Sequence, residues 1–169
     1  MTRVLQSQRR EPASGEVRSA VVFLHGYGAN GADLLGLADP LSEHLPDTLF
    51  VSPDAPERIE GMPNAFQWFP IPWIDGSSEE AAERGMRAAV EDVNAFLDAL
   101  MVDEDLMPEQ VALFGFSQGT MMALHVAPRR EDALAGWCMV IRTTWCRRNR
   151  CRRPPKPCKR PAGRTCLHM

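Results

Sequence analysis

A serine stands between two glycines in the pattern G-x-S-x-G over residues 115–119. The apolar run 110–114 precedes it, and the stretch 118–127 that follows has the composition of a helix. A serine at a strand-to-helix turn is typical of a nucleophile, because small flanking residues let its oxygen stand exposed above a sheet. The helix N-terminus offers a free N–H at Gln118 and a positive dipole end for an oxyanion. We predict that Ser117 performs acyl transfer, the alternative being a structural turn.

A glycine-rich loop with the sequence HGYGANG follows the first apolar run of the chain, residues 19–24. In serine hydrolases with this turn, the loop after an earlier strand supplies a second oxyanion donor, and the Tyr27 N–H is the candidate. The alternative is a plain glycine turn. His25 is not predicted to be the general base, because the base of such a triad follows the serine in the chain. We expect His25 to be buried and hydrogen-bonded to its own loop.

The elements that must position these residues alternate along the chain. Short apolar strands are predicted at residues 19–24, 48–52 and 110–114, and helices from Asp33 to about Leu45, at 79–101 and at 118–127. This alternation predicts βαβ units and a parallel sheet. Residues 57–76 are irregular, and Ser77 and Glu80 have the spacing of a capping box that begins the second helix.

Four separated motifs, in order, resemble the phospholipase/carboxylesterase family, the esterase branch that includes the acyl-protein thioesterases. They are VVFLHGYGANG, SPDAPE, QWF at residues 67–69 and LFGFSQGTMMALH. The resemblance covers about residues 18–136 and implies an α/β-hydrolase fold, a three-layer α/β sandwich with a mostly parallel sheet. Members of this family cleave carboxylic esters or thioesters without a metal or a cofactor.

The same resemblance implies roles for four residues. Ser117 is the nucleophile, Tyr27 and Gln118 donate the oxyanion-hole N–H groups, and Trp68 lies in the loop that borders the acyl site as a substrate-binding residue. For Trp68 the alternative is simple core packing. The expected substrate is a small acyl ester or thioester.

The family's remaining catalytic residues have no counterpart in this sequence. Relatives carry an Asp in a GxxDxxVP-like loop and a His in a GH motif, whereas after Ser117 the only acids are Glu131 and Asp132 and the only histidines are His125 and His168. His125 lies about 12 Å along the helix from the serine, at about 1.5 Å per residue, which is too far for a base. We therefore expect the C-terminal strands to be missing or replaced and the activity to be impaired.

The composition changes abruptly near Gly136. All 22 acidic residues lie before it, whereas all 5 cysteines and both lysines lie in residues 137–169. We divide the chain into a polar N-terminal extension (1–17), the N-terminal part of the hydrolase domain (18–136) and a basic Cys/Arg/Pro-rich tail (137–169). Only residues 137–141 of this tail could join a sheet, and the rest is predicted to be disordered. Its simplest interpretation is a change of reading frame.

Other functions are less compatible with the sequence. The cysteines lack the C-x2-4-C spacing of zinc sites, and their odd number argues against a disulfide framework. The alternatives to an impaired esterase are a non-catalytic remnant and a weak, non-specific nucleic-acid binder acting through the basic tail. No run is apolar enough to span a membrane and no secretory signal is visible, so a cytoplasmic location is expected. The strand at 110–114 would lie at or next to an open sheet edge, which favours aggregation or oligomerisation.

Overall fold

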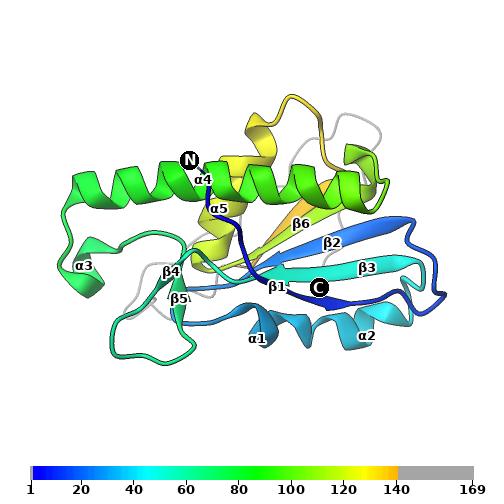
Figure 1. Ribbon diagram of the computed structural model, residues 1–169, viewed down its shortest axis with the longest axis horizontal. Helices are drawn as coiled ribbons and strands as arrows, with labels where there is room; N and C mark the ends of the chain where they lie inside the picture. Colours follow the sequence, from blue (N-terminus) through cyan, green and yellow to red (C-terminus); the bar gives the residue numbers. More distant parts are fainter. Residues whose placement is uncertain (1, 141–169) are drawn as a thin grey trace, which may run out of the picture.

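The computed structural model describes residues 2–140, and its framework is a five-stranded sheet (Figure 1). The strands lie in the order β1-β3-β2-β6-β7; β1 is antiparallel to β3, and the other neighbours are parallel. Their bounds are β1 (Ser7–Arg10), β2 (Ser19–Leu24), β3 (Thr48–Pro53), β6 (Val111–Phe116) and β7 (Gly136–Val140). A separate two-stranded ribbon pairs β4 (Glu57–Arg58) with β5 (Phe66–Gln67). The mostly parallel sheet confirms the predicted fold class.

Helices cover both faces of the sheet and make the molecule three layers thick (Figure 1). One face carries α4 (Glu79–Asp103) and α5 (Gln118–Val126), and the other carries α1 (Gly31–Leu35) and α2 (Ala38–Ser42). The remaining short turns are α3 (Pro72–Asp75), η1 (Pro108–Gln110) and η2 (Ala127–Arg129). None of the helices within residues 2–140 has both the length and the hydropathy that a bilayer crossing requires.

The core lies on both sides of the sheet because successive side chains of a strand point to opposite faces. The larger cluster lies between the sheet and helices α4 and α5; its members include Val22, Leu24, Val51, Leu97, Leu113 and Met122. On the other face, Phe23 and Phe50 pack against Ala38 of α2. Each fully buried side chain of this kind contributes about 1.5–3 kcal/mol, and β2 and β3 carry such side chains on both faces.

The single helix predicted from Asp33 to about Leu45 is wrong, because α1 and α2 are separate short helices. In a continuous helix the backbone nitrogen of Pro40 would have to donate to the Gly36 carbonyl. Proline has no N–H, and its ring clashes with the carbonyl four residues earlier. The chain instead makes tighter bonds at the junction, from the Leu37 N–H to the Leu34 carbonyl at 3.0 Å.

The long helix α4 begins one residue later than a Ser77 cap would place it. The side chain of Ser78 accepts the Ala81 N–H at 3.1 Å and so caps the helix. The Ser77 N–H is used differently, since it donates to Asp75 Oδ1 at 2.8 Å at the end of α3. The predicted capping box of Ser77 and Glu80 is therefore wrong, although the helix itself is confirmed and extends to Asp103.

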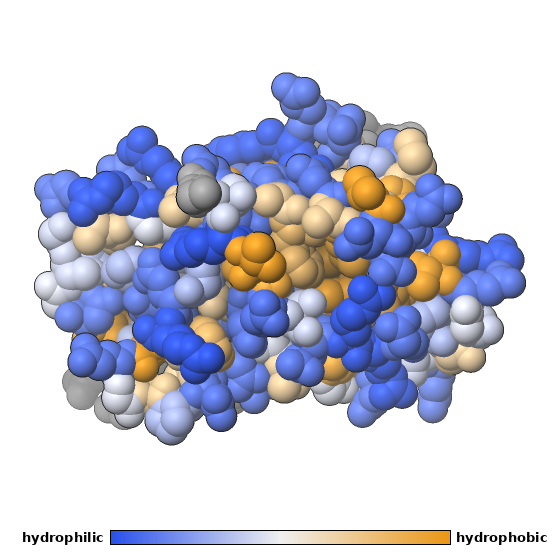
Figure 2. Space-filling view, in the orientation of Figure 1, coloured by the Kyte–Doolittle hydropathy of each residue, from blue (hydrophilic) through white to orange (hydrophobic). Residues whose placement is uncertain are grey.

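No element was predicted within residues 1–17, but the structure places β1 there. This strand has the sequence SQRR and is mostly exposed, so it lacks the apolar alternation that marks a strand. The segment is also tied to α4, because Arg3 Nε donates to Asp92 Oδ2 at 2.8 Å and Asp92 is buried. On the face shown in Figure 2, an apolar area lies where this segment crosses between α4 and the sheet.

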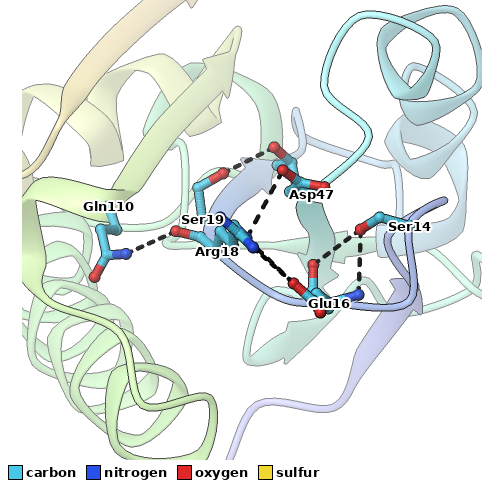
Figure 3. Close-up of polar contacts among 7 residues, drawn as sticks. Ser14, Glu16, Arg18, Ser19, Asp47 and Gln110 are labelled. Atoms are coloured by element: carbon cyan, nitrogen blue, oxygen red, sulfur yellow. Dashed lines mark hydrogen bonds and ion pairs between the residues drawn. The ribbon is translucent and has the colours of Figure 1, made fainter.

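The amino ends of the central strands are held by polar contacts (Figure 3). Gln110 Nε2, just before β6, donates to the Arg18 carbonyl at 2.8 Å, just before β2. The Arg18 N–H donates to the Asp47 carbonyl at 2.9 Å, and its exposed guanidinium bonds Glu16 at 2.8 Å. These contacts set the strands in register at the end of the sheet away from Ser117, and the carboxyl ends are left for the site.

The strand β7 agrees with the expectation that residues just after Gly136 could join the sheet. It pairs in parallel with β6, from Ala112 opposite Gly136 to Phe116 opposite Val140. Within residues 2–140, β7 is the outermost strand on this side, so β6 lies next to the edge. The predicted disordered tail, including His168, lies outside the described residues from 141 onward.

Candidate active site

Ser117 forms the turn between β6 and α5 at the carboxyl end of the sheet. Its backbone has φ 52° and ψ −113°, a conformation that side chains other than glycine rarely adopt. Such strain persists where the surroundings enforce it, and it is common at functional sites. The Ser117 side chain is exposed, as expected of a nucleophile that must reach a substrate.

The two glycines of the motif are required by close packing at this turn. A Cβ on Gly119 would lie 2.0 Å from the Leu24 carbonyl oxygen, and a Cβ on Gly115 would lie 2.4 Å from the Gly119 carbonyl oxygen. Any side chain at either position would therefore overlap backbone atoms. The glycines let the start of α5 lie directly against the end of β2, and this contact brings Ser117 beside the HGYG loop.

We expect Gly119→Ala to unfold the domain or to lower its stability by more than about 4 kcal/mol, as severe overpacking does. The matched control is Gly36→Ala, because a Cβ on Gly36 meets nothing within 4 Å and its φ is −58°. That control is expected to be neutral or stabilising by up to about 1 kcal/mol. Thermal unfolding followed by circular dichroism compares the two, and equal melting temperatures would contradict the packing described above.

Tyr27 and Gln118, the predicted oxyanion donors, lie on the two segments that meet at Ser117. Gln118 is the first residue of α5, and Tyr27 lies in the turn after β2. A Cβ on Gly26 would lie 3.2 Å from Ser117 Cβ, so the turn touches the nucleophile. Across residues 2–140, neither the Tyr27 nor the Gln118 backbone N–H donates a hydrogen bond. Both donors are thus available for a ligand.

The side chain of Gln118 has a structural task that the sequence did not reveal. It is 2% exposed, its Oε1 accepts the Trp68 N–H at 3.0 Å, and its Nε2 donates to the Phe69 carbonyl at 2.8 Å. The segment at 68–69 is thereby fixed beneath the nucleophile turn. In the sequence, the only sign of this contact is that a polar residue follows the serine. The partners of Gln118 are about fifty residues away in the sequence, so no local pattern indicates them.

Trp68 is fully buried within the described part of the chain. Its indole N–H donates to the His25 carbonyl at 2.8 Å, and its ring centroid lies 5.4 Å from that of His25. These contacts match the core-packing alternative and place Trp68 under the HGYG loop. A direct contact between Trp68 and a substrate remains a prediction.

His25 is buried and hydrogen-bonded to its own loop, as expected. Its Nδ1 lies 2.8 Å from the Gly26 carbonyl oxygen, and the Ala55 N–H donates to its Nε2 at 2.9 Å. Burial lowers the pKa of His25 below the ordinary value of 6.5. Both ring nitrogens therefore serve the backbone, which agrees with its exclusion as the general base.

Within residues 2–140 no hydrogen bond joins a histidine or a carboxylate to the Ser117 hydroxyl. His125 lies near the far end of α5, and Glu131 and Asp132 are exposed in the segment beyond it. His168 lies outside the described residues. The structure thus assembles a nucleophile turn with two N–H groups beside it, and within residues 2–140 no acid or base of a triad is hydrogen-bonded to Ser117.

Comparison with known proteins places these features among esterases. The sequence model of the family described as phospholipase/carboxylesterase matches residues 7–149. Acyl-protein thioesterase 1 of Saccharomyces cerevisiae is 32% identical over 136 residues, which cover 73% of this chain and 60% of that protein. Acyl-protein thioesterase 1 of Cryptococcus neoformans is 30% identical over 132 residues, which cover 75% of this chain and 54% of that protein.

Among solved structures, the esterase PE8 is 36% identical, with a TM-score of 0.73 over 79% of this chain and 62% of that one. The carboxylesterase of Bacillus cereus is 21% identical, with a TM-score of 0.62, and supports the fold alone. These matches confirm the α/β-hydrolase fold expected from the motifs. The chain spans little more than half the length of the curated relatives it matches.

Proposed function

The chain belongs to the phospholipase/carboxylesterase family, and from this premise we propose that it is a serine hydrolase of carboxylic esters or thioesters with Ser117 as its nucleophile. The observation that carries the proposal is the strained backbone of Ser117, held between two tightly packed glycines beside two N–H groups that have no hydrogen-bond acceptor within residues 2–140. A turn of this kind exposes a hydroxyl next to oxyanion donors, which is the arrangement that acyl transfer requires.

In the proposed reaction the Ser117 oxygen attacks the carbonyl carbon of the ester or thioester. The carbonyl oxygen gains the negative charge, and the Tyr27 and Gln118 N–H groups donate to it. The tetrahedral intermediate collapses to an acyl-serine, and the alcohol or thiol leaves with a proton. Water then attacks the acyl group, regenerates the hydroxyl and releases the carboxylic acid. The buried side chains of Gln118 and Trp68 hold the two donor segments in place.

The weak point of this reaction is removal of the Ser117 proton. No described residue is placed to accept it, so water or buffer must do so. A positioned general base typically raises the rate by a factor of about 10²–10⁴, and the reaction proceeds without this contribution. The relatives named as acyl-protein thioesterases make acyl thioesters a candidate substrate class besides simple esters. A chain that folds but does not turn over, a non-catalytic remnant, is the second candidate, favoured by the same lack of a positioned base.

We expect the purified chain to hydrolyse p-nitrophenyl butyrate only slowly. Loss of triad members leaves roughly 10³–10⁴-fold catalysis over water from binding and the oxyanion hole. The kcat should therefore lie far below the value of about 10 s⁻¹ that is typical of enzymes. The absorbance of the released p-nitrophenol measures the rate, and heat-unfolded chain serves as the blank. A kcat near that typical value would reveal a base that we have not identified, and a rate equal to the blank would favour the remnant.

A further inference from the structure

The hydrogen bonds of His25 define where its ring proton lies. The Ala55 backbone N–H can only donate, so Nε2, 2.9 Å away, is the acceptor and carries no proton. The neutral ring then has its proton on Nδ1, which lies 2.8 Å from the Gly26 carbonyl oxygen. His25 is therefore a fixed donor to Gly26, and the residue is wholly buried.

The Gly26 carbonyl belongs to the same peptide unit as the Tyr27 N–H. Peptide units are planar, and in the trans form the C=O and N–H bonds point in opposite directions. Across the described residues no peptide bond is cis. The carbonyl is held toward His25 by Nδ1–H and also accepts the Ala29 N–H at 3.3 Å. The Tyr27 N–H consequently points away from the imidazole, where it meets no acceptor within residues 2–140.

This peptide lies against the nucleophile, since a Cβ on Gly26 would be 3.2 Å from Ser117 Cβ. Building on the proposed function, we propose that His25 is a positioning residue of the oxyanion hole. It holds the Gly26–Tyr27 peptide in the orientation that leaves the Tyr27 N–H free to donate to a developing oxyanion. His25 itself touches neither the substrate nor the proton of Ser117.

The same histidine connects the two donor segments through buried hydrogen bonds. Its own carbonyl accepts the Trp68 indole N–H at 2.8 Å. The Trp68 backbone N–H donates at 3.0 Å to the side chain of Gln118, whose backbone supplies the second donor. The oxyanion is absent from the bound substrate and develops in the transition state, so a disturbed donor is expected to lower kcat and leave KM nearly unchanged.

Two substitutions separate positioning from packing. His25→Asn places an amide N–H near the position of Nδ1, and so keeps the donor to Gly26 but loses the acceptor for the Ala55 N–H. His25→Leu fills the space and loses both. Both variants lose the bond to Ala55, so both are expected to be less stable than the parent chain. Thermal unfolding measures this loss of stability in each variant. Only the leucine variant releases the Gly26 carbonyl.

The first measurement is p-nitrophenyl butyrate hydrolysis by the full chain and its variants. His25→Leu is expected to lower kcat about 10²-fold with little change in KM, as removal of one oxyanion donor does, whereas His25→Asn keeps most of the activity. Equal kcat values for the two variants, in a chain whose turnover depends on Ser117, would overturn the proposal. If the parent chain gains no acetyl group at Ser117 from p-nitrophenyl acetate, it is the proposed hydrolase function that fails.

The second measurement needs no turnover. The residual dipolar coupling of the Tyr27 amide reports the orientation of its N–H bond in solution. The parent chain and His25→Asn are expected to share one value, and His25→Leu is expected to differ. An unchanged coupling in the leucine variant would show that the turn alone fixes this peptide, and His25 would then have no positioning role, whatever the activity of the chain.

Discussion

Replacing Ser117 by alanine is expected to abolish covalent acylation of the chain. With p-nitrophenyl acetate, the parent chain should gain the mass of one acetyl group, because Ser117 is exposed in the strained turn beside the Tyr27 and Gln118 N–H groups. Alanine removes only the oxygen, so the backbone and the packing against the HGYG loop are retained. Any hydrolysis that remains is direct attack by water, assisted by the oxyanion donors, which are separate from the serine.

Intact-mass spectrometry of briefly acylated protein makes this measurement. The matched control is His125→Ala, since His125 lies on the same helix but away from the nucleophile turn. The control is expected to acylate like the parent. An alanine variant at 117 that still gains one acetyl group would show that the nucleophile is a different residue. Melting temperatures of the two variants test whether a loss of acylation reflects unfolding.

The fold could be predicted where apolar residues follow one another along a segment. The predicted strand at 19–24 coincides with β2, because the five apolar residues that follow Ser19 are typical of a strand that is covered on both faces in a parallel sheet. The pattern failed where a single residue decided the outcome. Pro40 divides the first helix in two, and β1 stays hidden because its residues face solvent at the edge.

The candidate site shows the same division between local and distant determinants. The turn at Ser117 is encoded by five consecutive residues, so the motif predicts its geometry. The contacts that hold the oxyanion segments are encoded far apart: Gln118 binds the backbone at Trp68, and Trp68 binds the backbone at His25. No periodicity or spacing connects such residues, and only the folded chain brings them together.

The codons beyond Gly136 are expected to encode the missing acid loop in a second reading frame. Tryptophan and methionine each have one codon, TGG and ATG, so part of the nucleotide sequence follows from the protein. In the frame that starts at the third base of each codon, Met139 and Val140 together supply GGT, which is glycine. Trp145 and Cys146 together supply GTG, which is valine. The spacing between this glycine and valine is that of G-x-x-D-x-x-V.

Two further codons decide whether this match is real. The aspartate codon would consist of the third base of the Arg142 codon and the first two bases, AC, of the Thr143 codon. It reads GAC only if the arginine codon ends in G. In the family's pattern a proline follows the valine. Its codon would consist of the third base of the Cys146 codon and the first two bases of the Arg147 codon, and it reads CCG only if these codons are TGC and CGN. Sequencing the gene is therefore expected to show these three choices. Any other third base at Arg142 would give asparagine, histidine or tyrosine and would exclude the acid loop from this frame.

The fold gives this expectation a structural meaning. The strand β7 is parallel to β6, and Val140 lies opposite Phe116, the residue before the nucleophile. The shifted glycine codon falls at Met139 and Val140, so the encoded loop would begin where β7 ends. Because the carboxyl ends of parallel strands meet at one edge of a sheet, that loop would emerge beside Ser117. The shifted frame also keeps a valine across Trp137 and Cys138, which suits the same strand. A restored frame would thus add a carboxylate in the loop beside the nucleophile.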